Sequence, residues 1–556
     1  MSTYIEQRKE ILVCILFSVT IFYFQYGIGI LNPTNIYWLL DDPYQSFIGW
    51  SFYRNADFFT YPLFKNYDLG MEIGSTIIYT DSLPLMTIIF KPFSRLLPVD
   101  FQYLGIWILL CYILTAYFGY KIFNLYITES YEKLFCVLLL LISPIFLQRF
   151  NNGHIALMSH WIILCSFYVY LNKNYRLRFW LILILLSSLV HAYILAMVLI
   201  IASFSTMKNV FNEGISKKIM GRYLRFGLHL TTIALFTFFC LYTFGYFDID
   251  GERLDHGWGG YRLNLLSIIN PEGLRANWSM ITGNLFTYEN SRIGDYEGFN
   301  YLGMGMVINV LLAIFLTIKR KIAFSSTNSK LIIIFCLLLI IFSLTNHIAF
   351  GPYELVSYNF PEFLKIFTAP FRASGRFFWP VYYIIFISSL VIVFKNLDSK
   401  KVLVYALAIL LIQVVDLSGG MRTINRISTN NQYSPLPKES FEIPGLDAVA
   451  KDYEKLIYVF PSYAPKNWIQ LTYFAYRNNL KTNFMYFGRR NKTAEDRYIR
   501  EITLQFERNN LSKDSIYYFS DKKLWEGFYS KVGNTSKKIE IIDNHGKSHL
   551  IILPDK

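Results

Sequence analysis

The chain has 556 residues, 54% of them apolar and 18% aromatic, and its mean hydropathy of +0.33 is well above that of a soluble domain of this length. The net charge of +14 would suit a nucleic-acid-binding protein, but much of the basic charge lies in short loops between apolar segments. This distribution argues against nucleic acid as a partner and indicates a protein that crosses a membrane many times.

Eleven apolar segments are predicted to cross the membrane as helices, since a hydrocarbon core of about 30 Å calls for roughly 20 apolar residues. In chain order they are 11–31, 101–120, 133–149, 155–171, 178–190, 192–206, 226–246, 301–318, 330–349, 377–394 and 402–418. The first is predicted to be an uncleaved signal anchor, because it is too long for a signal peptide and no cleavage site follows it. A further stretch, 83–97, contains two prolines and two basic residues and is expected to lie at the interface or to re-enter. All six cysteines fall inside predicted spans, which indicates neither a disulfide framework nor a zinc site.

Alternate loops are basic and are expected to face the cytoplasm. They hold Arg8 and Lys9; Lys121 and Lys133; Lys173, Arg176 and Arg178; Lys208, Lys217, Lys218, Arg222 and Arg225; Lys319, Arg320 and Lys321; and Lys395, Lys400 and Lys401. The stretch 178–206 is interpreted as a hairpin turning near His191, because a single long helix would place the basic loop 208–225 outside. The N-terminus is then cytoplasmic, and the outer face receives the short loop 149–154 and the larger loops 32–100, 247–300 and 350–376.

The last part of the chain lacks long apolar segments. Short alternating stretches predict strands at Lys455–Phe460, Asn483–Phe487, Ser515–Phe519, Lys538–Ile542 and His549–Leu553, and a charged helix at Lys492–Arg508. We therefore predict two parts: an all-α polytopic membrane domain over 1–418 with a large first outer loop at 32–100, and a small soluble α/β domain over 419–556. The second part is expected on the periplasmic side of a bacterial inner membrane.

The first outer loop begins with two adjacent carboxylates, Asp41 and Asp42, expected at a helix exit near the membrane surface. Mutual repulsion and partial desolvation would make such a pair better proton acceptors, which suits a general base. The alternative is that the two acids simply end a helix at the aqueous boundary. Several more acids in the same loop, among them Asp81, weaken this alternative, although Asp81 or Ser82 could equally be a helix cap.

Polar residues also gather near the outer ends of the middle spans. Arg149 and His154 border a short outer loop, His160 follows inside the next span, and His191 lies at the predicted hairpin turn. Ionisable groups at this depth are costly and usually face a cavity, although each histidine could be a satisfied interfacial side chain. No two of them have the i,i+4 spacing of a helical metal pair, so no metal site is predicted.

A third group precedes the tenth span, where Arg372 and Arg376 are spaced i,i+4 and are expected to point the same way on a helix entering the membrane. Paired guanidiniums suit the binding of a phosphate. The alternative is that both arginines reach toward lipid headgroups. It is disfavoured because they lie on the outer side, where the positive-inside bias does not place them.

The loop 247–300 is rich in Gly, Tyr, Asn and Trp, the residue types that stack on sugar rings and hydrogen-bond to them. With the start of the following span it supplies Asn264, Glu297 and Tyr301. The same composition fits any packed interfacial loop. A nucleotide-binding Gly-Lys-Ser/Thr loop, a Gly-x-Ser-x-Gly elbow and a cysteine cluster are absent from the sequence.

Together these features resemble the GT-C superfamily, integral membrane glycosyltransferases that use polyprenyl-phosphate-linked sugars. From about residue 32 to 420, the chain more closely resembles a bacterial group of GT-C-like multispan proteins. The resemblance lies in Asp42-Pro43 through Gly49-Trp50, Tyr79-Thr80-Asp81-Ser82-Leu83-Pro84-Leu85, Gly153-His154, Asn264-Leu265-Leu266, Tyr296-Glu297-Gly298-Phe299-Asn300-Tyr301-Leu302-Gly303 and Phe371-Arg372-Ala373-Ser374-Gly375-Arg376. The last part of the chain, 419–556, carries no such resemblance.

The resemblance implies a hexosyltransferase-type enzyme with an undecaprenyl-phosphate-linked donor. An acid after the first span would act as base or position the acceptor. This is Asp41 or Asp42, with Asp42 favoured by its Asp-Pro context. Arg372 and Arg376, with Arg149 or His154, would bind the leaving phosphate. Asp81 and Arg54 would orient Asp42 or hold the acceptor. The residues implied in binding the acceptor and the sugar are His160, His191, Asn264, Glu297 and Tyr301.

The expected acceptor is a lipid-linked or surface polysaccharide such as O-antigen, and inversion at the sugar is expected. No metal, nucleotide or other cofactor is required, and a flippase and a donor-synthesising glycosyltransferase are expected partners besides membrane lipids. An O-antigen polymerase or ligase is one alternative, and an essential acid in the first loop would count against it. A transporter of glycan or lipid-linked substrates is the other, disfavoured by the scarcity of charge within spans 330–349 and 402–418. The scheme requires the first-loop acids and the arginine pair to face one non-cytoplasmic cavity.

Overall fold

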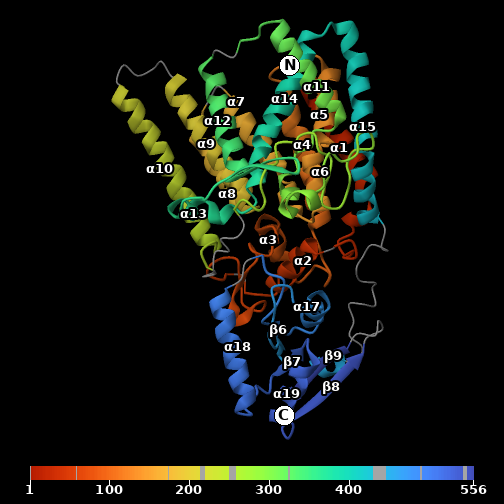
Figure 1. Cartoon of the computed structure of the whole chain (residues 1–556), viewed down its shortest axis with the longest axis vertical. Helices are drawn as coiled ribbons and strands as arrows, with labels where there is room; N and C mark the ends of the chain where they lie inside the picture. Colours follow the sequence, from red (N-terminus) through yellow and green to blue (C-terminus); the bar gives the residue numbers. More distant parts are fainter. Residues whose placement is uncertain are drawn as a thin grey trace. The chain divides into compact units, whose positions relative to one another are not determined.

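The computed structural model is mostly helical and describes residues 2–39, 41–57, 59–172, 175–212, 219–248, 258–323, 326–429, 446–488, 491–542 and 548–555 (Figure 1). These residues divide into two compact units. The first unit comprises 1–29, 106–238 and 253–429, and the second 30–105, 239–252 and 430–556. The predicted basic-loop residues Lys173, Lys217 and Lys218, and the predicted outer-loop stretch 249–257, lie outside the described residues.

Long apolar helices build the first unit, although residues 104–105 and 239–244, at the ends of two of them, belong to the second. They are α1 (Ser2–Tyr26), α4 (Leu104–Phe123), α5 (Ser130–Leu141), α6 (Pro144–Asn151), α7 (His160–Leu171), α8 (Leu177–Ser188), α9 (Ala192–Asn212), α10 (Ile219–Phe244), α11 (Met304–Lys319), α12 (Thr327–Leu344), α14 (Trp379–Asn396) and α15 (Ser399–Thr429). Among them α11 packs against α14 and α15, α1 against α5 and α15, and α9 against α7 and α8. Outside these helices lie a hairpin of β3 (His347–Phe350) and β4 (Tyr353–Ser357) and the short helix α13 (Glu362–Thr368).

Each of the eleven predicted spans contains at least one of these helices. Eight helical stretches of the described chain are long and apolar enough to cross a membrane: Ile5–Tyr26, Leu104–Phe123, Ser130–Asn151, Ala192–Val210, Met220–Phe244, Thr327–Leu344, Ser374–Asn396 and Lys401–Thr429. Three more predicted spans correspond to shorter apolar helices, at Ile155–Leu171, Leu177–Ser188 and Met304–Lys319. The fold is therefore compatible with a multi-pass membrane protein.

Several predicted spans differ locally from the structure, and two of the differences have a clear form. The span 133–149 is interrupted between α5 and α6, because Pro144 has no N–H to donate and disfavours helical backbone at the residue before it. The span 330–349 ends as a helix at Leu344, and its last residues form strand β3 instead. In both cases a helix ends before the predicted end of its span.

Buried polar side chains link the helices of the first unit. The amide of Asn309 on α11 donates to the hydroxyl of Ser389 on α14 at 2.9 Å and accepts from Tyr405 on α15 at 2.9 Å. Hydrogen bonds of this kind hold apolar helices together where the hydrophobic effect cannot, because lipid is as apolar as the helix surfaces. These contacts fix the mutual register of α11, α14 and α15.

The second unit joins the first loop to the last part of the chain. The loop contributes α2 (Asp42–Tyr53), α3 (Pro84–Phe90) and the short pair β1 (Lys65–Asn66) and β2 (Ser75–Thr76). The C-terminal domain, residues 446–555, contains a five-stranded sheet in the order β6-β5-β7-β9-β8. Its elements are α16 (Leu446–Ala450), β5 (Lys455–Tyr458), α17 (Trp468–Arg477), β6 (Lys481–Thr482), α18 (Lys492–Glu507), β7 (Ser515–Phe519), α19 (Lys522–Val532), β8 (Ser536–Ile542) and β9 (Ser548–Pro554).

The predicted α/β character of this domain is confirmed. Strand β5 pairs in parallel with β6 and β7, whereas β9 pairs antiparallel with β7 and β8. The predicted strand Asn483–Phe487 is wrong, because only Lys481 and Thr482 pair with β5 and the following residues are irregular. The other four predicted strands and the helix at Lys492–Arg508 are present, with ends shifted by at most two residues.

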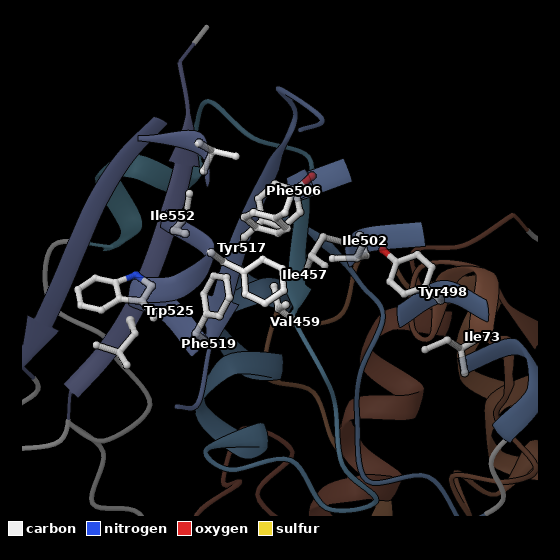
Figure 2. Close-up of a cluster of buried hydrophobic side chains, with 13 residues drawn as sticks. Ile73, Ile457, Val459, Tyr498, Ile502, Phe506, Tyr517, Phe519, Trp525 and Ile552 are labelled. Carbon is white, nitrogen blue, oxygen red and sulfur yellow. The ribbon is translucent and has the colours of Figure 1, made fainter. Parts of the chain in front are cut away.

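A shared hydrophobic cluster makes the second unit continuous. Figure 2 shows Ile73 of the first loop beside Tyr498 and Ile502 of α18, in a cluster that extends to Phe506 and Tyr517. The compact units thus divide the chain differently from the predicted boundary at residue 418, since they place the first loop with the C-terminal domain. Contacts between segments some 400 residues apart cannot be predicted from the local sequence pattern of either segment.

Candidate functional site

Arg149 and His154 are brought together by the turn that ends α6. The helix stops at Asn151, and Gly153 takes the left-handed conformation with a φ of +80°, which glycine adopts without the strain a side chain would add. The N–H of His154 then donates to the carbonyl of Arg149 at 2.8 Å. The Gly153-His154 pair therefore folds the imidazole back toward the arginine.

Two glycines allow the segments that carry Glu297 and Arg376 to meet. A Cβ on Gly298 would lie 2.1 Å from the carbonyl oxygen of Arg262, and a Cβ on Gly375 would lie 2.7 Å from the Cα of Gly298. Only glycine permits such approaches of one backbone to another. The consequence is that the 3-10 turns Ile293–Gly298 and Ser374–Phe378 lie against each other.

A buried ion cluster forms where these segments converge. The carboxylate of Glu297 accepts from Arg149 Nη1 at 3.0 Å, from Arg376 Nε at 2.9 Å and from Arg376 Nη2 at 2.5 Å. The Nδ1 atom of His154 lies 3.8 Å from Glu297 Oε1. The Arg149 side chain is 0% exposed and that of Glu297 is 4% exposed. We call Arg149, His154, Glu297 and Arg376 the arginine cluster.

An aromatic ring lies against each guanidinium. Arg149 lies over the ring of Trp379 at 5.1 Å, and Arg376 lies over the ring of Tyr193 at 4.8 Å. Such contacts favour a desolvated cation. They also hold each guanidinium in one plane, which fixes the direction in which its N–H groups point.

The charges of the arginine cluster do not cancel, since two guanidiniums face one carboxylate. Burial alone would raise the pKa of Glu297, but Arg376, His154 and Arg149 together hold it well below its ordinary range, so the carboxylate is ionised. The Nε and Nη2 atoms of Arg149 have no hydrogen-bond partner among the described residues. Each buried donor left unpaired costs about 1–3 kcal/mol. The arrangement can therefore bind an anion through the unpaired edge of Arg149.

The predicted helical pairing of Arg372 with Arg376 is not present. Ala373 separates two 3-10 turns, so the two arginines do not share a helix. Arg376 is buried in the arginine cluster, whereas Arg372 is exposed and lies over the ring of Tyr261 at 5.6 Å. Of the predicted phosphate ligands, the structure brings together Arg149, His154 and Arg376, and it adds Glu297, which had been expected at the sugar.

The two remaining predicted histidines pack beside the cluster. His160 is fully buried, its Nδ1 lies 2.8 Å from the hydroxyl of Tyr383, and its ring is 4.5 Å from that of Trp379. It therefore supports the tryptophan beneath Arg149. His191 accepts the N–H of Tyr193 on Nδ1 at 3.1 Å, so it stabilises the start of α9.

Two further predicted sugar-binding residues have structural partners instead. The amide of Asn264 donates to the carbonyl of Gly351 at 2.8 Å and accepts the N–H of the same residue at 2.9 Å, which fixes the β3–β4 hairpin. The hydroxyl of Tyr301 donates to the buried carboxylate of Asp416 at 2.7 Å. Both polar groups are used within the protein fold, so the structure does not present them to a ligand.

The first-loop acids begin a helix rather than ending one. The preceding helix α1 stops at Tyr26, and Asp42 is the first residue of α2. Asp41 and Asp81 both have positive φ values, +50° and +51°, which are uncommon for residues other than glycine. Strained backbone of this kind persists only where surrounding structure enforces it, and it is concentrated at functional sites.

The alternative that Asp81 or Ser82 merely caps a helix is not what the structure shows. Helix α3 begins at Pro84 with Leu83 at its cap position, and no side chain caps it. The hydroxyl of Ser82 instead donates to the carbonyl of Ser46 at 2.8 Å, which attaches the turn containing Asp81 to α2. The helix that begins at Asp42 and the turn that carries Asp81 are thus joined.

Arg54, which was predicted to orient Asp42 or to hold the acceptor, bonds to the main chain. Its two terminal nitrogens donate to the carbonyls of Ser94 (2.6 Å), Leu97 (3.0 Å), Pro98 (2.7 Å) and Val99 (3.1 Å). These bonds hold the segment 94–99 against the end of α2. The structure therefore gives Arg54 a folding role.

The buried carboxyl of Glu272 was not predicted from the sequence, because Pro271-Glu272-Gly273 matches no motif. Its Oε2 atom is buried without a partner among the described residues, and its main-chain carbonyl accepts from the hydroxyl of Tyr288. Burial raises the pKa of this carboxyl from 4.5 to about 7, and the charge of Glu289 adds to the effect. A carboxyl of this kind can exchange a proton near neutral pH.

Glu272 should make stability depend on pH. Because the folded protein holds this proton more tightly than the unfolded chain, stability should fall as pH rises from about 4.5 through 7. Allowing for solvent screening, we expect a change on the order of 1–2 kcal/mol. Thermal unfolding of the Glu272→Gln variant in detergent should lack this pH dependence, with the exposed Glu362→Gln as the surface control. An unaltered slope in Glu272→Gln would assign the effect to another group.

Comparison with protein-family models shows which family the chain belongs to. A search of curated proteins finds no significant match. The model described as "Domain of unknown function (DUF6311)" matches residues 15–418, and the one described as "DUF6311 C-terminal domain" matches residues 445–539. The first match contains every residue of the arginine cluster and the first-loop acids, and it covers more than half of the chain. The chain therefore belongs to the DUF6311 family.

Proposed function

We propose that this chain is a membrane glycosyltransferase that takes a sugar from undecaprenyl phosphate and transfers it to a lipid-linked or surface polysaccharide, such as O-antigen, on the periplasmic face. The observation that carries the proposal is the fully buried guanidinium of Arg149, two of whose nitrogens lack a partner among the described residues. Phosphate oxygens match the fork of an arginine in geometry and charge. A donor phosphate would supply the acceptors that this guanidinium lacks.

The proposed reaction breaks the bond between the anomeric carbon of the sugar and the phosphate oxygen. The leaving undecaprenyl phosphate gains negative charge in the transition state, and Arg149 and Arg376 stabilise this charge more than that of the bound donor. The acceptor hydroxyl forms the new bond to the anomeric carbon from the opposite face, which inverts it, and its proton passes to Asp42. The two arginines thus offset the negative charge on the leaving phosphate, and Asp42 takes the proton of the acceptor hydroxyl.

Glu297 has a defined part in this scheme. It holds Arg376 by two hydrogen bonds and Arg149 by one, so it orients both guanidiniums before the donor arrives. Donors fixed in advance stabilise developing charge without reorganising at the moment of reaction. The carboxylate also limits the net positive charge, which allows the phosphate to leave once transfer is complete.

Surface-glycan composition tests the proposal. Cells that carry Asp42→Asn should show the glycan of cells without the chain, whereas Asp41→Asn cells, the matched control, should keep most of the wild-type pattern. Removing a general base costs on the order of 10²–10⁴ in rate. A wild-type glycan from Asp42→Asn at normal protein amount would remove Asp42 from this role. A change in polysaccharide length without any change in its sugars would instead favour a polymerase.

A further inference from the structure

The first loop extends the sheet of the C-terminal domain. Leu69 pairs in parallel with Thr482 of the edge strand β6. The N–H of Thr482 donates to the carbonyl of Asp68 at 2.9 Å, and the N–H of Gly70 donates to the carbonyl of Thr482 at 2.7 Å. A short segment of the loop thus covers the edge of the sheet, where unpaired main-chain groups would otherwise remain.

The helix that begins at Asp42 is held by the same domain. Gln45, less than one helical turn after Asp42, donates through Nε2 to the carbonyl of Tyr486 at 2.6 Å. The hydroxyl of Tyr44 donates to the carbonyl of Ile469 at 3.1 Å, and its ring lies 5.7 Å from that of Trp468. Gln45 is 3% and Tyr44 is 0% exposed, so these bonds are shielded from water.

The turn that carries Asp81 has an equivalent attachment. The N–H of Gly488 donates to the carbonyl of Tyr79, two residues before Asp81, at 3.2 Å. A Cβ on Gly488 would lie 2.8 Å from that oxygen, so this approach requires glycine. The positive φ of Asp81 lies directly beside this contact.

The far end of the first loop is anchored as well. The hydroxyl of Tyr473 donates to the carboxylate of Asp100 at 2.9 Å, and that of Tyr476 donates to the carbonyl of Val99 at 2.7 Å. Ile73 packs into the hydrophobic cluster of the domain (Figure 2). The domain therefore holds the loop near both acids and at its end.

We propose that the C-terminal domain is a positioning element, which holds Asp42, next to the strained Asp41, and the strained Asp81 in their working geometry through the contacts of Gln45 and Gly488. This inference rests on the proposed function, because only that function gives the two acids a part in catalysis. The acids themselves begin or border segments whose backbone is uncommon, and such backbone relaxes unless neighbouring structure enforces it. Ile469, Tyr486 and Gly488 supply that enforcement through main-chain groups, and the close approach at Gly488 also requires glycine.

A pair of double variants of the full chain tests this inference. In Gln45→Met with Gly488→Ala, one hydrogen bond is lost and a methyl group is forced against the carbonyl of Tyr79. The matched control is Gln505→Met with Gly527→Ala, because a Cβ on Gly527 meets nothing within 4 Å. Hydrogen exchange of the purified protein is measured over residues 42–54 and 77–83, and sugar transfer is measured in cells.

Exchange in both segments should quicken about ten-fold in the first double variant, and transfer should fall about 10- to 100-fold, because a displacement of about 1 Å has this effect on a reacting group. The control should change neither. Unchanged exchange in the first variant would overturn the inference while leaving the proposed function intact. Faster exchange with normal transfer would also overturn the inference. It would show that the acids do not have the role assigned to them, which a wild-type glycan from Asp42→Asn would show as well.

Discussion

Replacing Arg149 by methionine should abolish the binding of undecaprenyl phosphate and lower sugar transfer by about 10²–10³-fold, while the free energy of unfolding stays within about 1 kcal/mol of wild type. The reason is the asymmetry of its contacts. Glu297 keeps two hydrogen bonds from Arg376 when Arg149 is removed, and the unpaired donors of Arg149 disappear with it. A buried cation of this kind contributes little to stability.

The measurement is thermal unfolding of the purified chain in detergent, with undecaprenyl phosphate as the ligand and undecaprenol as the form that lacks phosphate. Saturation at about 100 Kd should stabilise the wild type by about 2.7 kcal/mol. Arg149→Lys, which keeps the charge and loses the planar fork, should bind weakly. Arg320→Met, on the exposed surface, is the matched control. Equal stabilisation of wild type and Arg149→Met, or stabilisation by undecaprenol, would contradict a phosphate site here.

Replacing Glu297 by glutamine should destabilise the protein by about 3–5 kcal/mol, the cost of leaving buried charge unpaired. Without the carboxylate, Arg149 and Arg376 would lie side by side in surroundings that exclude water. The exposed pair of Lys365 with Glu362 is the control: Glu362→Gln should change stability by no more than about 0.5 kcal/mol. The free energy of unfolding in detergent is the measurement.

Two further results identify the cause of that loss. In a double-mutant cycle, Arg376→Gln should cost less in the Glu297→Gln background than in wild type, because the two side chains interact directly. The pH dependence has a definite sign as well. Since the pKa of Glu297 is held below its ordinary 4.5, its contribution is fully present above about pH 4.5 and is lost as pH falls further. Additive effects of the two substitutions would show that the hydrogen bonds contribute little.

Hydropathy and spacing were enough to find the helices and most of the sheet. The length of an apolar segment and the alternation of a strand are local properties, so β7 at Ser515–Phe519 coincides with its prediction and each predicted span contains a helix. Local chemistry also identified Arg149, His154 and Arg376 as members of a polar site. It could not assign Glu297 between the two arginines, since the glycine contacts that place it there join segments far apart in the chain.

By itself, then, the sequence determined which segments are apolar helices and where the α/β domain lies. It also showed which polar residues lie near apolar spans, where burying them costs free energy. Only the tertiary structure decided which of those polar residues are used up by the fold. Asn264, Tyr301 and Arg54 match the composition of a binding site, yet their hydrogen bonds end on main chain or on a buried carboxylate. The physical reason is that a buried polar group must find a partner, and whether this partner is the protein or a ligand depends on contacts made across the whole chain.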